Sequence, residues 1–508
     1  MINRVGRALS LAFLLGLPLH AGLEPAHVFS DHMVLQRDKP LVVWGWDDPG
    51  ASVTVDLSGT SQSATAAADG RWEIKLPAMK ASSAPTTMTI HDKDHSITIS
   101  DILVGDVWLC SGQSNMEFAL GGANGGHDAV LAADQLTQIR LLHVSSPASG
   151  LPVDDIENSW TPCSSRTANT FSAVGFFFGK ALTEKLGVPV GLIEAAWGGT
   201  PIQPWTPREG FALDDKLKPD LAMLDQAEKE YRAALPAKLP EIEDWLVKSK
   251  AALADNAPLP GPPAWPTDPL VVNGSPSKDT VIFNSRIHPL IPFAIRGVIW
   301  YQGESNHGDD LYSTRLHALI RSWRQLWGEG DFPFYFVQLA PLTPVYAKDE
   351  LVNLWQAQSS ALDLPNTGMA VTNDIGDLTT IHPKDKLDVG ERLARIAFAK
   401  EYALPGIVFS GPVYKSMQID GAKIRLTFDY AEGGLASRDN QPLSWFEIAG
   451  ADGKFVAADA VIDGQQVVVS SPQVPAPTAV RFAWANNAVP NLINHEGLPT
   501  PAFQTSQP

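Results

Sequence analysis

Four polar segments of the chain carry residue types that could together hydrolyse an ester. The first places Ser114 after an apolar run, Val104 to Leu109, in a turn of small residues. A serine hydroxyl is a poor nucleophile at neutral pH unless a base takes its proton, and a turn at the end of a strand leaves room for base and substrate. The turn differs from the Gly-x-Ser-x-Gly elbow of α/β-hydrolases. Taken alone, a serine in this position is more often the N-cap of a helix.

The second and third segments offer groups that could stabilise a negative oxygen. Residues 297–306 run from an apolar strand into Gln302, Glu304 and Asn306. The Gln302 amide could donate to a developing oxyanion, and Glu304 could orient a histidine. The third segment, residues 194–201, ends a strand with paired glycines that include Gly199. Glycine lets a backbone N–H approach a substrate oxygen closely, although a tight turn alone would also require it.

The fourth segment supplies a base. His382 follows a predicted strand and precedes a predicted helix, and Asp374 and Asp377 lie shortly before it. Pro383 restricts the backbone at His382, and a histidine in a loop above a sheet is suited to general-base catalysis. A lone loop histidine is more often structural. Catalysis is favoured because all four segments follow predicted strands and together provide nucleophile, oxyanion donors and base.

The elements that must position these residues alternate between apolar strands and helices over residues 104–404. The predicted elements are strands at 104–109, 188–194, 297–300, 334–339 and 369–371, and helices at 171–185 and 386–399. Such alternation predicts a parallel sheet covered by helices on both faces, with ligands beyond the carboxyl ends of the strands. Residues 206–280 interrupt the pattern with a charged helical stretch, Asp220 to Leu253, and a proline-rich run. We expect an insertion that forms a lid or a wall of the site.

Other regions flank this catalytic domain. Short β-rich runs separated by turn residues predict β modules of sandwich type over 22–103 and 405–508. A chain of 508 residues also exceeds the roughly 250 to 300 at which a single core stops growing. Residues 1–21 read as a signal peptide with two arginines, an apolar run and a small residue at the end, so we expect a periplasmic or extracellular protein.

The composition limits which molecules the protein is expected to bind. A net charge of −18 disfavours nucleic acid and anionic membrane surfaces, and no later apolar run approaches the roughly 20 residues of a membrane span. No cluster of cysteine and histidine has metal-binding spacing, so we expect no metal and no cofactor. Cys110 and Cys163 are the two cysteines, and an oxidising compartment would permit, without requiring, a disulfide between them. Fifteen tryptophans suit sugar rings as well as core packing.

The four segments resemble those of the sialate O-acetylesterase family, which belongs with SGNH-type esterases and is similar to some acetylxylan esterases. They are Gly-Gln-Ser-Asn-Met, Trp-Gly-Gly-Thr-Pro, Trp-Tyr-Gln-Gly-Glu-Ser-Asn and Ile-His-Pro-Lys-Asp-Lys. The resemblance covers nearly the whole mature chain. It implies a three-layer α/β/α domain flanked by β modules, no metal, and a serine esterase that acts on an acetylated sugar, oligosaccharide or polysaccharide.

Carried onto this sequence, the resemblance gives Ser114 as nucleophile and His382 as its base. The oxyanion would lie between the N–H groups of Ser114 and Gly199 and the amide of Gln302. The expected oxyanion- or substrate-binding residues are therefore Gly199, Gln302, Asn306 and Arg286.

Two positions depart from the family pattern. Many SGNH esterases carry an acid three residues before the histidine, where this chain has Thr379. The candidate acids are Glu304, Asp377 and Asp374, with Glu304 favoured because related acetylxylan esterases use the glutamate of their Gln-Gly-Glu motif; an arrangement without an acid is also open. Arg286 stands where relatives typically have methionine, so we expect it to shape a different substrate pocket.

The sequence leaves the substrate open between sialate and acetylated xylan or another plant hemicellulose. Sialate is an anion and needs a local cation, for which Arg286 is one candidate. A glycan-binding protein without catalysis is the alternative class, and it gives no reason for nucleophile, base and oxyanion donors to occur together.

Overall fold

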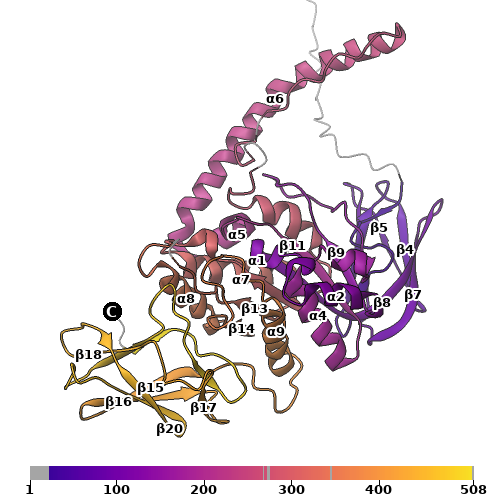
Figure 1. Cartoon of the computed structure of the whole chain (residues 1–508). Coiled ribbons are helices and arrows are strands. Elements are labelled where there is room, and N and C mark those ends of the chain that lie inside the picture. Colours follow the sequence, from indigo (N-terminus) through magenta and orange to yellow (C-terminus); the bar gives the residue numbers. More distant parts are fainter. Residues whose placement is uncertain (1–21, 267, 272–274, 344–345, 506–508) are drawn as a thin grey trace, which may run out of the picture.

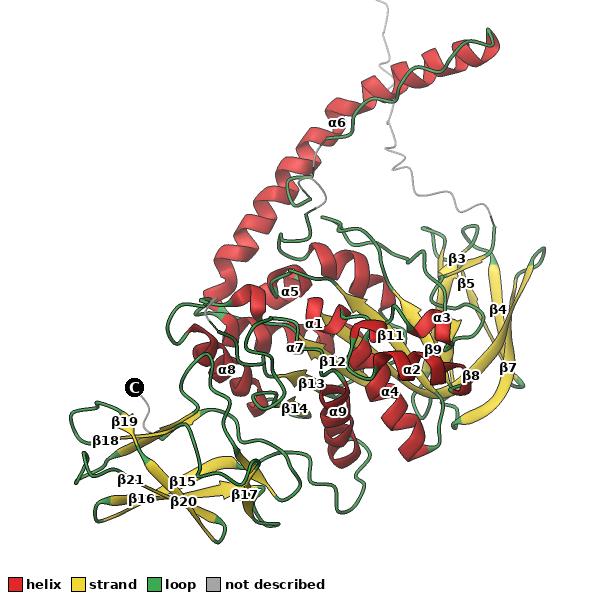
Figure 2. Ribbon diagram, viewed as in Figure 1, coloured by secondary structure: helices red, strands yellow, loops and turns green. Residues whose placement is uncertain are grey.

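The computed structural model describes residues 22–266, 268–271, 275–343 and 346–505, so the predicted signal peptide lies outside the described residues. Its centre is a sheet with the strand order β10-β9-β11-β8-β12-β13-β14 (Figures 1 and 2). These strands are β8 (Ser96–Gly112), β9 (Ile139–His143), β10 (Thr161–Pro162), β11 (Val190–Ala196), β12 (Gly297–Tyr301), β13 (Phe334–Val337) and β14 (Thr367–Ala370).

Parallel pairing dominates this sheet. Every neighbouring pair along the order is parallel except β10 with β9. All residues of β11, β12 and β13 are buried, as strands covered on both faces must be. The carboxyl ends of the parallel strands therefore meet at one edge of the sheet, where the candidate residues follow β8, β11, β12 and β14.

Helices cover both faces of the sheet and confirm the predicted α/β class. The helices are α1 (Ser114–Glu117), α2 (Gly126–Ala132), α3 (Ser165–Ala168), α4 (Ala173–Leu186), α5 (Arg208–Phe211), α6 (Lys218–Ala254), α7 (Tyr312–Trp327), α8 (Glu350–Ser360) and α9 (Leu387–Lys400).

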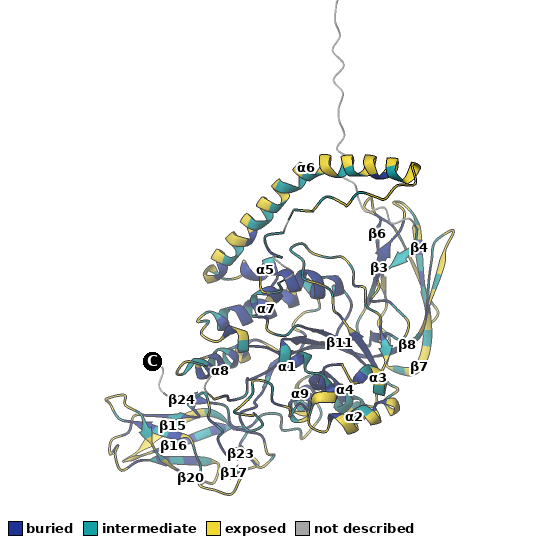
Figure 3. Cartoon of the chain, turned by 45° about the horizontal axis from the view of Figure 1, so that its top comes forward, coloured by how far each residue is buried: buried dark blue, intermediate teal, exposed yellow. Residues whose placement is uncertain are grey.

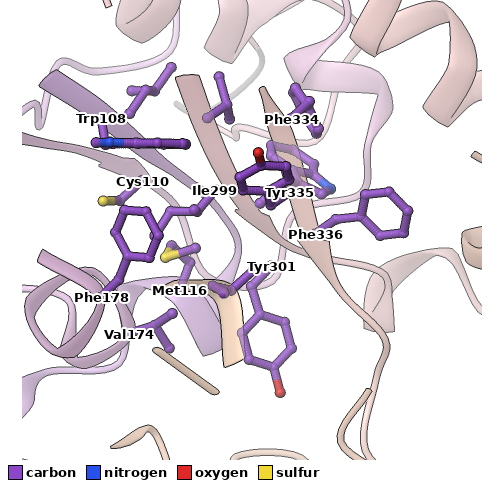
Figure 4. Close-up of a cluster of buried hydrophobic side chains, with 14 of the residues drawn as sticks. Trp108, Cys110, Met116, Val174, Phe178, Ile299, Tyr301, Phe334, Tyr335 and Phe336 are labelled. Atoms are coloured by element: carbon purple, nitrogen blue, oxygen red, sulfur yellow. The ribbon is translucent and has the colours of Figure 1, made fainter. Parts of the chain in front are cut away.

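The core shows which helix covers which face. Phe178 of α4 packs edge-on against Trp108 of β8, with ring centroids 4.9 Å apart (Figure 4). On the other face Trp323 of α7 packs against Trp300 of β12 at 6.0 Å. Because successive side chains of a strand point to opposite faces, these aromatic contacts fix the helices on the two sides of the sheet.

The N-terminal β region continues directly into the central sheet. Its strands are β1 (Glu24–Pro25), β2 (Val34–Gln36), β3 (Leu41–Trp46), β4 (Ser52–Leu57), β5 (Thr60–Thr65), β6 (Arg71–Leu76) and β7 (Ser82–His91). The first half of β8 pairs with β7 and β2, and its second half lies between β11 and β12. The predicted boundary between residues 103 and 104 thus falls inside one strand.

The C-terminal region is also built of strands. They form the sheets β15-β16-β21-β20, β17-β23 and β19-β18-β22-β24. Their bounds are β15 (Val413–Asp420), β16 (Lys423–Asp429), β17 (Leu435–Ser437), β18 (Phe446–Ala449), β19 (Val456–Ala457), β20 (Asp459–Asp463), β21 (Gln466–Ser470), β22 (Ala479–Phe482), β23 (Leu492–Asn494) and β24 (Phe503–Gln504).

The insertion forms an arm. The helical stretch predicted at 220–253 corresponds to α6, which extends away from the body of the molecule (Figure 1) and is largely exposed (Figure 3). The following proline-rich segment returns along it, where Trp245 donates its indole N–H to Pro260 O at 2.9 Å. No helix in the described part of the chain combines the length and apolar character of a membrane span.

Candidate active site

Strand β8 positions Ser114 at the carboxyl edge of the sheet. The strand ends at Gly112, and Ser114 begins α1 two residues later. Gly112 has φ of +140°, and a Cβ there would lie 2.2 Å from Tyr301 O, so this close crossing requires glycine. Gln113 Oε1 accepts the backbone N–H of Gly303 at 3.2 Å, which ties the serine turn to the segment after β12.

His382 contacts Ser114 across 268 residues of sequence. Its Nε2 lies 2.8 Å from Ser114 Oγ, and it comes from the loop between β14 and α9. Burial, together with the positive charge of Lys386, lowers the pKa of His382 below its ordinary value of 6.5. The imidazole is therefore neutral at pH 7, the form that can accept the proton of a serine hydroxyl.

Two backbone N–H groups beside Ser114 have no acceptor within the part of the chain that the structure describes. A Cβ built on Gly198 would lie 3.3 Å from Ser114 Cβ, so the glycine turn after β11 abuts the serine. Gly198 N–H donates to Glu117 at 2.8 Å, whereas the N–H groups of Ser114 and Gly199 donate to no described residue. Free, rigidly held N–H groups of this kind can stabilise an oxyanion.

The side-chain amide of Gln302 donates its hydrogen bonds to other residues of the protein. Gln302 is fully buried, and its Nε2 donates to Thr200 O at 3.2 Å and to Asn306 Oδ1 at 2.8 Å. Its Oε1 accepts the Tyr312 hydroxyl at 3.0 Å. Asn306 Oδ1 also accepts the Ile202 N–H at 2.8 Å, and its Nδ2 donates to two further side chains. Gln302 and Asn306 thus join the turn after β11 to the turn after β12, and contacts with other described residues use both N–H groups of each side-chain amide.

Two of the candidate acids lie away from His382. Asp377 is exposed and accepts the backbone N–H and the hydroxyl of Thr379, at 2.9 and 2.6 Å. Asp374 is held by Arg392 through two N–H groups at 2.7 and 2.8 Å. Among the described residues, the remaining hydrogen bond of His382 runs from its own N–H to Thr380 Oγ1 at 3.1 Å. No carboxylate of the described ranges therefore reaches the second ring nitrogen.

Glu304, the favoured acid, reaches the histidine loop indirectly. It begins η8 (Glu304–Asn306), and its Oε1 accepts the amide Nδ2 of Asn115. The same Nδ2 donates to Ile381 O at 2.8 Å, one residue before His382. Glu304 Oε2 is buried without a hydrogen-bond partner among the described residues. Burial raises the pKa of this carboxyl, against the opposing effects of Asn115 and Lys386.

Arg286 belongs to the wall of the site. It lies in η6 (Phe283–Ile287) and stacks on the Trp197 ring at 4.0 Å. Its Nε donates to Ser146 O at 2.9 Å and its Nη1 to Ala196 O at 2.6 Å. The residue is 7% exposed, and burial lowers its pKa to about 10. Arg286 therefore supports the turn that abuts Ser114, and two of its five N–H donors bind backbone carbonyls.

Possible metal ligands and cysteines do not gather at the site. Within the described ranges, no three residues among histidine, cysteine, aspartate and glutamate are placed to share a metal ion. Cys110 and Cys163 are buried free thiols, so the structure does not form the disulfide that the sequence would permit.

Sequence reasoning did not single out Asn115 and Lys386. Lys386 Nζ donates to Asn115 Oδ1 at 2.5 Å, and both residues are buried. The available signal was position, because Asn115 directly follows Ser114 and Lys386 ends the Ile-His-Pro-Lys-Asp-Lys segment.

Comparison with known proteins identifies the family. The family model described as "Carbohydrate esterase, sialic acid-specific acetylesterase" matches residues 104–235 and 282–399, which contain all four segments. The crystal structure of a carbohydrate acetylesterase from Xanthomonas citri superposes with a TM-score of 0.81 and 35% identity, covering 95% of this chain and 100% of that one. The sialate O-acetylesterase of Rattus norvegicus is 28% identical over 91% of this chain and 90% of its own length. That of Homo sapiens is 29% identical over 83% and 79%. The chain therefore belongs to the sialate O-acetylesterase family of carbohydrate esterases.

Proposed function

We propose that this protein hydrolyses O-acetyl esters of sugars through the hydroxyl of Ser114. The supporting observation is the 2.8 Å contact between Ser114 Oγ and His382 Nε2. Ser114 Oγ attacks the acetyl carbonyl while its proton passes to His382. The bond between acetyl carbon and sugar oxygen then breaks as His382 returns the proton to that oxygen. A water molecule, deprotonated by His382, attacks the acetyl-serine and releases acetate.

The oxyanion would be held by the free N–H groups of Ser114 and Gly199. Their lack of protein acceptors supports this assignment, because a donor that is already satisfied gains nothing as charge develops on the substrate. Gln302, which the family pattern includes in the oxyanion hole, would instead fix the positions of the two turns through Thr200 and Asn306.

His382 would act without a carboxylate on its second nitrogen. Glu304 would influence it through Asn115 and the carbonyl of Ile381, which precedes the histidine. This assignment follows from the positions of Asp374, paired with Arg392, and Asp377, which is exposed on the surface.

The substrate would be an acetylated sugar. The mammalian relatives are named sialate O-acetylesterases and the solved relative a carbohydrate acetylesterase. Two of the five N–H donors of Arg286 bind backbone carbonyls, so only the remaining ones could bind a sialate carboxylate. We take acetylated sialate and acetylated xylan as the two substrates to compare.

The test is acetate release by the wild type and Ser114→Ala from 9-O-acetylated sialic acid and from acetylated xylan. We expect Ser114→Ala to lose roughly 10³-fold or more in kcat, since removal of the nucleophile leaves only binding and oxyanion stabilisation. Ser96→Ala is the matched control, because Ser96 is exposed at the opposite end of β8. Full activity of Ser114→Ala would overturn the mechanism, and the preferred wild-type substrate would name the sugar.

We further propose that residues 1–21 direct export and that the flanking β regions are sandwich-type modules. Expression of the full chain in a secreting host followed by N-terminal sequencing should give a mature protein that begins near Gly22. An unprocessed protein retained in the cytoplasm would contradict export.

A further inference from the structure

A buried lysine lies behind the pair formed by Ser114 and His382. Lys386 is 0% exposed and precedes α9, four residues after His382. Within the described part of the chain, its Nζ makes one hydrogen bond, 2.5 Å to Asn115 Oδ1, and faces the rings of Phe118 and Tyr301, each 5.1 Å away. An ammonium has three N–H donors, so one amide oxygen and two aromatic faces replace only part of its hydration.

Asn115 links this lysine to both partners of the pair. Its Oδ1 accepts from Lys386, and its Nδ2 donates to Glu304 and to Ile381 O. An amide has one acceptor end and one donor end, so a cation on one side and a carboxyl on the other fix which way it faces. Asn115 follows Ser114 in the chain, and Ile381 precedes His382. One oriented side chain therefore couples the serine turn to the histidine loop.

We propose that Lys386 is a positioning residue of the esterase, which acts through the Asn115 amide to hold His382 against Ser114. This inference rests on the proposed serine mechanism. Lys386 itself need not touch the substrate, since Asn115 transmits its effect to the reacting pair.

The charges around Lys386 support the same role. The groups that face it are Glu304 from η8 and Asp385 from its own loop, both of which raise its pKa, with the Tyr301 ring and His382 beside it. Burial outweighs the two acids and lowers the pKa of Lys386 to about 7. The ammonium in turn lowers the pKa of His382. A cation near the histidine keeps the imidazole neutral in the resting enzyme, whereas the acid of a conventional triad would favour its protonation.

The test is the pH dependence of kcat/KM for Lys386→Met on the acetyl ester that the wild type prefers. We expect kcat/KM to fall roughly 10- to 100-fold with KM little changed, because the reacting pair loses its alignment. We also expect the acid limb of the profile to move to higher pH, because the pKa of His382 rises when the neighbouring cation is removed. Lys384→Met is the matched control, since Lys384 is an exposed lysine in the same loop.

A second variant separates alignment from charge. Asn115→Ser breaks the link but leaves the Lys386 charge, so it should lower kcat while the acid limb stays near that of the wild type. The inference is overturned if Lys386→Met keeps kcat/KM within about twofold and its acid limb does not move. If Lys386→Met yields no folded protein, unchanged kcat in Asn115→Ser overturns it instead. Activity retained by Ser114→Ala would refute the serine mechanism itself, a result distinct from either of these.

Discussion

Two buried charged residues, one in the central sheet and one in the loop before α9, differ in how well they are paired. Asp106, in β8, is 0% exposed and accepts two N–H groups from Arg37 at 2.9 Å each and two from Arg296 at 2.9 and 2.8 Å. It also accepts the Tyr402 hydroxyl at 3.0 Å. Lys386 is equally buried, but its side chain makes a single hydrogen bond to the residues that the structure describes. Asp106 is thus fully paired, whereas Lys386 is only partly paired.

The pKa values show what this difference does. Burial raises the pKa of Asp106, but the two arginines outweigh it and the net shift is downward, so the carboxylate stays ionised. For Lys386 burial prevails, and the pKa falls to about 7. Asp106 connects the N-terminal β region to the catalytic sheet, whereas Lys386 lies at the candidate active site. A fully paired buried charge serves stability here, and an incompletely paired one gives a group that titrates near neutral pH.

The largest effect we expect comes from breaking the paired cluster. Asp106→Asn should lower the free energy of unfolding by about 3 to 5 kcal/mol, because the half-buried guanidinium groups of Arg37 and Arg296 lose the buried carboxylate that they share. Asp106 lies about 20 Å of strand from Gly112, so kcat per folded molecule should change little. Urea unfolding followed by tryptophan fluorescence, with an esterase assay at low temperature, measures both quantities.

Asp38→Asn is the matched control for that substitution. Asp38 is 33% exposed and pairs with Lys80, which is 93% exposed. A surface pair of this kind contributes about 0 to 1 kcal/mol. Equal losses in the two variants would show that the Asp106 cluster is not the stabilising feature that the comparison assumes.

The pH dependence of stability differs in sign between the two charges. The folded pKa of Asp106 lies below its ordinary 3.8, so its contribution is present above pH 3.8 and is lost as the pH falls through the folded value. The folded pKa of Lys386 is about 7 against an ordinary 10.5. Between these values the unfolded chain binds more protons, so the Lys386 contribution makes the protein more stable as the pH rises through this window.

Removal of the incompletely paired charge of Lys386 should have an intermediate effect on the free energy of unfolding. Lys386→Met at pH 6 should change the free energy of unfolding by no more than about 1 kcal/mol, or increase it, because the lost hydrogen bond is offset by removal of a poorly solvated ammonium. The rise in stability between pH 7 and 10.5 should become smaller in this variant. Urea unfolding at several pH values measures both. A loss as large as that of Asp106→Asn would mean that Lys386 serves the fold rather than the reaction.

The sequence predicts the elements and the meeting of Ser114 with His382, but not the side-chain contacts around them. Local patterns sufficed for the elements: the strand predicted at 297–300 is β12, and the helix predicted at 386–399 is α9. The contact between Ser114 and His382 followed from topology, because polar segments after parallel strands meet at one edge. The hydrogen bonds of Gln302 and the contact of Lys386 with Asn115 depend on side-chain packing between distant segments, which no local pattern records.

The smallest effects should come from Glu304 and Asp377. The sequence suggests both as the acid that orients His382, and the structure places both elsewhere. Glu304→Gln keeps an oxygen for the Asn115 amide but removes the charge that raises the pKa of Lys386, so we expect kcat/KM to fall on the order of tenfold. Asp377→Asn is the matched isosteric change, and it should stay within about twofold because Asp377 is exposed and, among the described residues, its side chain accepts hydrogen bonds from Thr379 alone. Steady-state kinetics on one acetyl ester compares the two. A larger loss in Asp377→Asn would mean that Asp377 moves to His382 during the reaction and supplies the acid that the resting structure lacks.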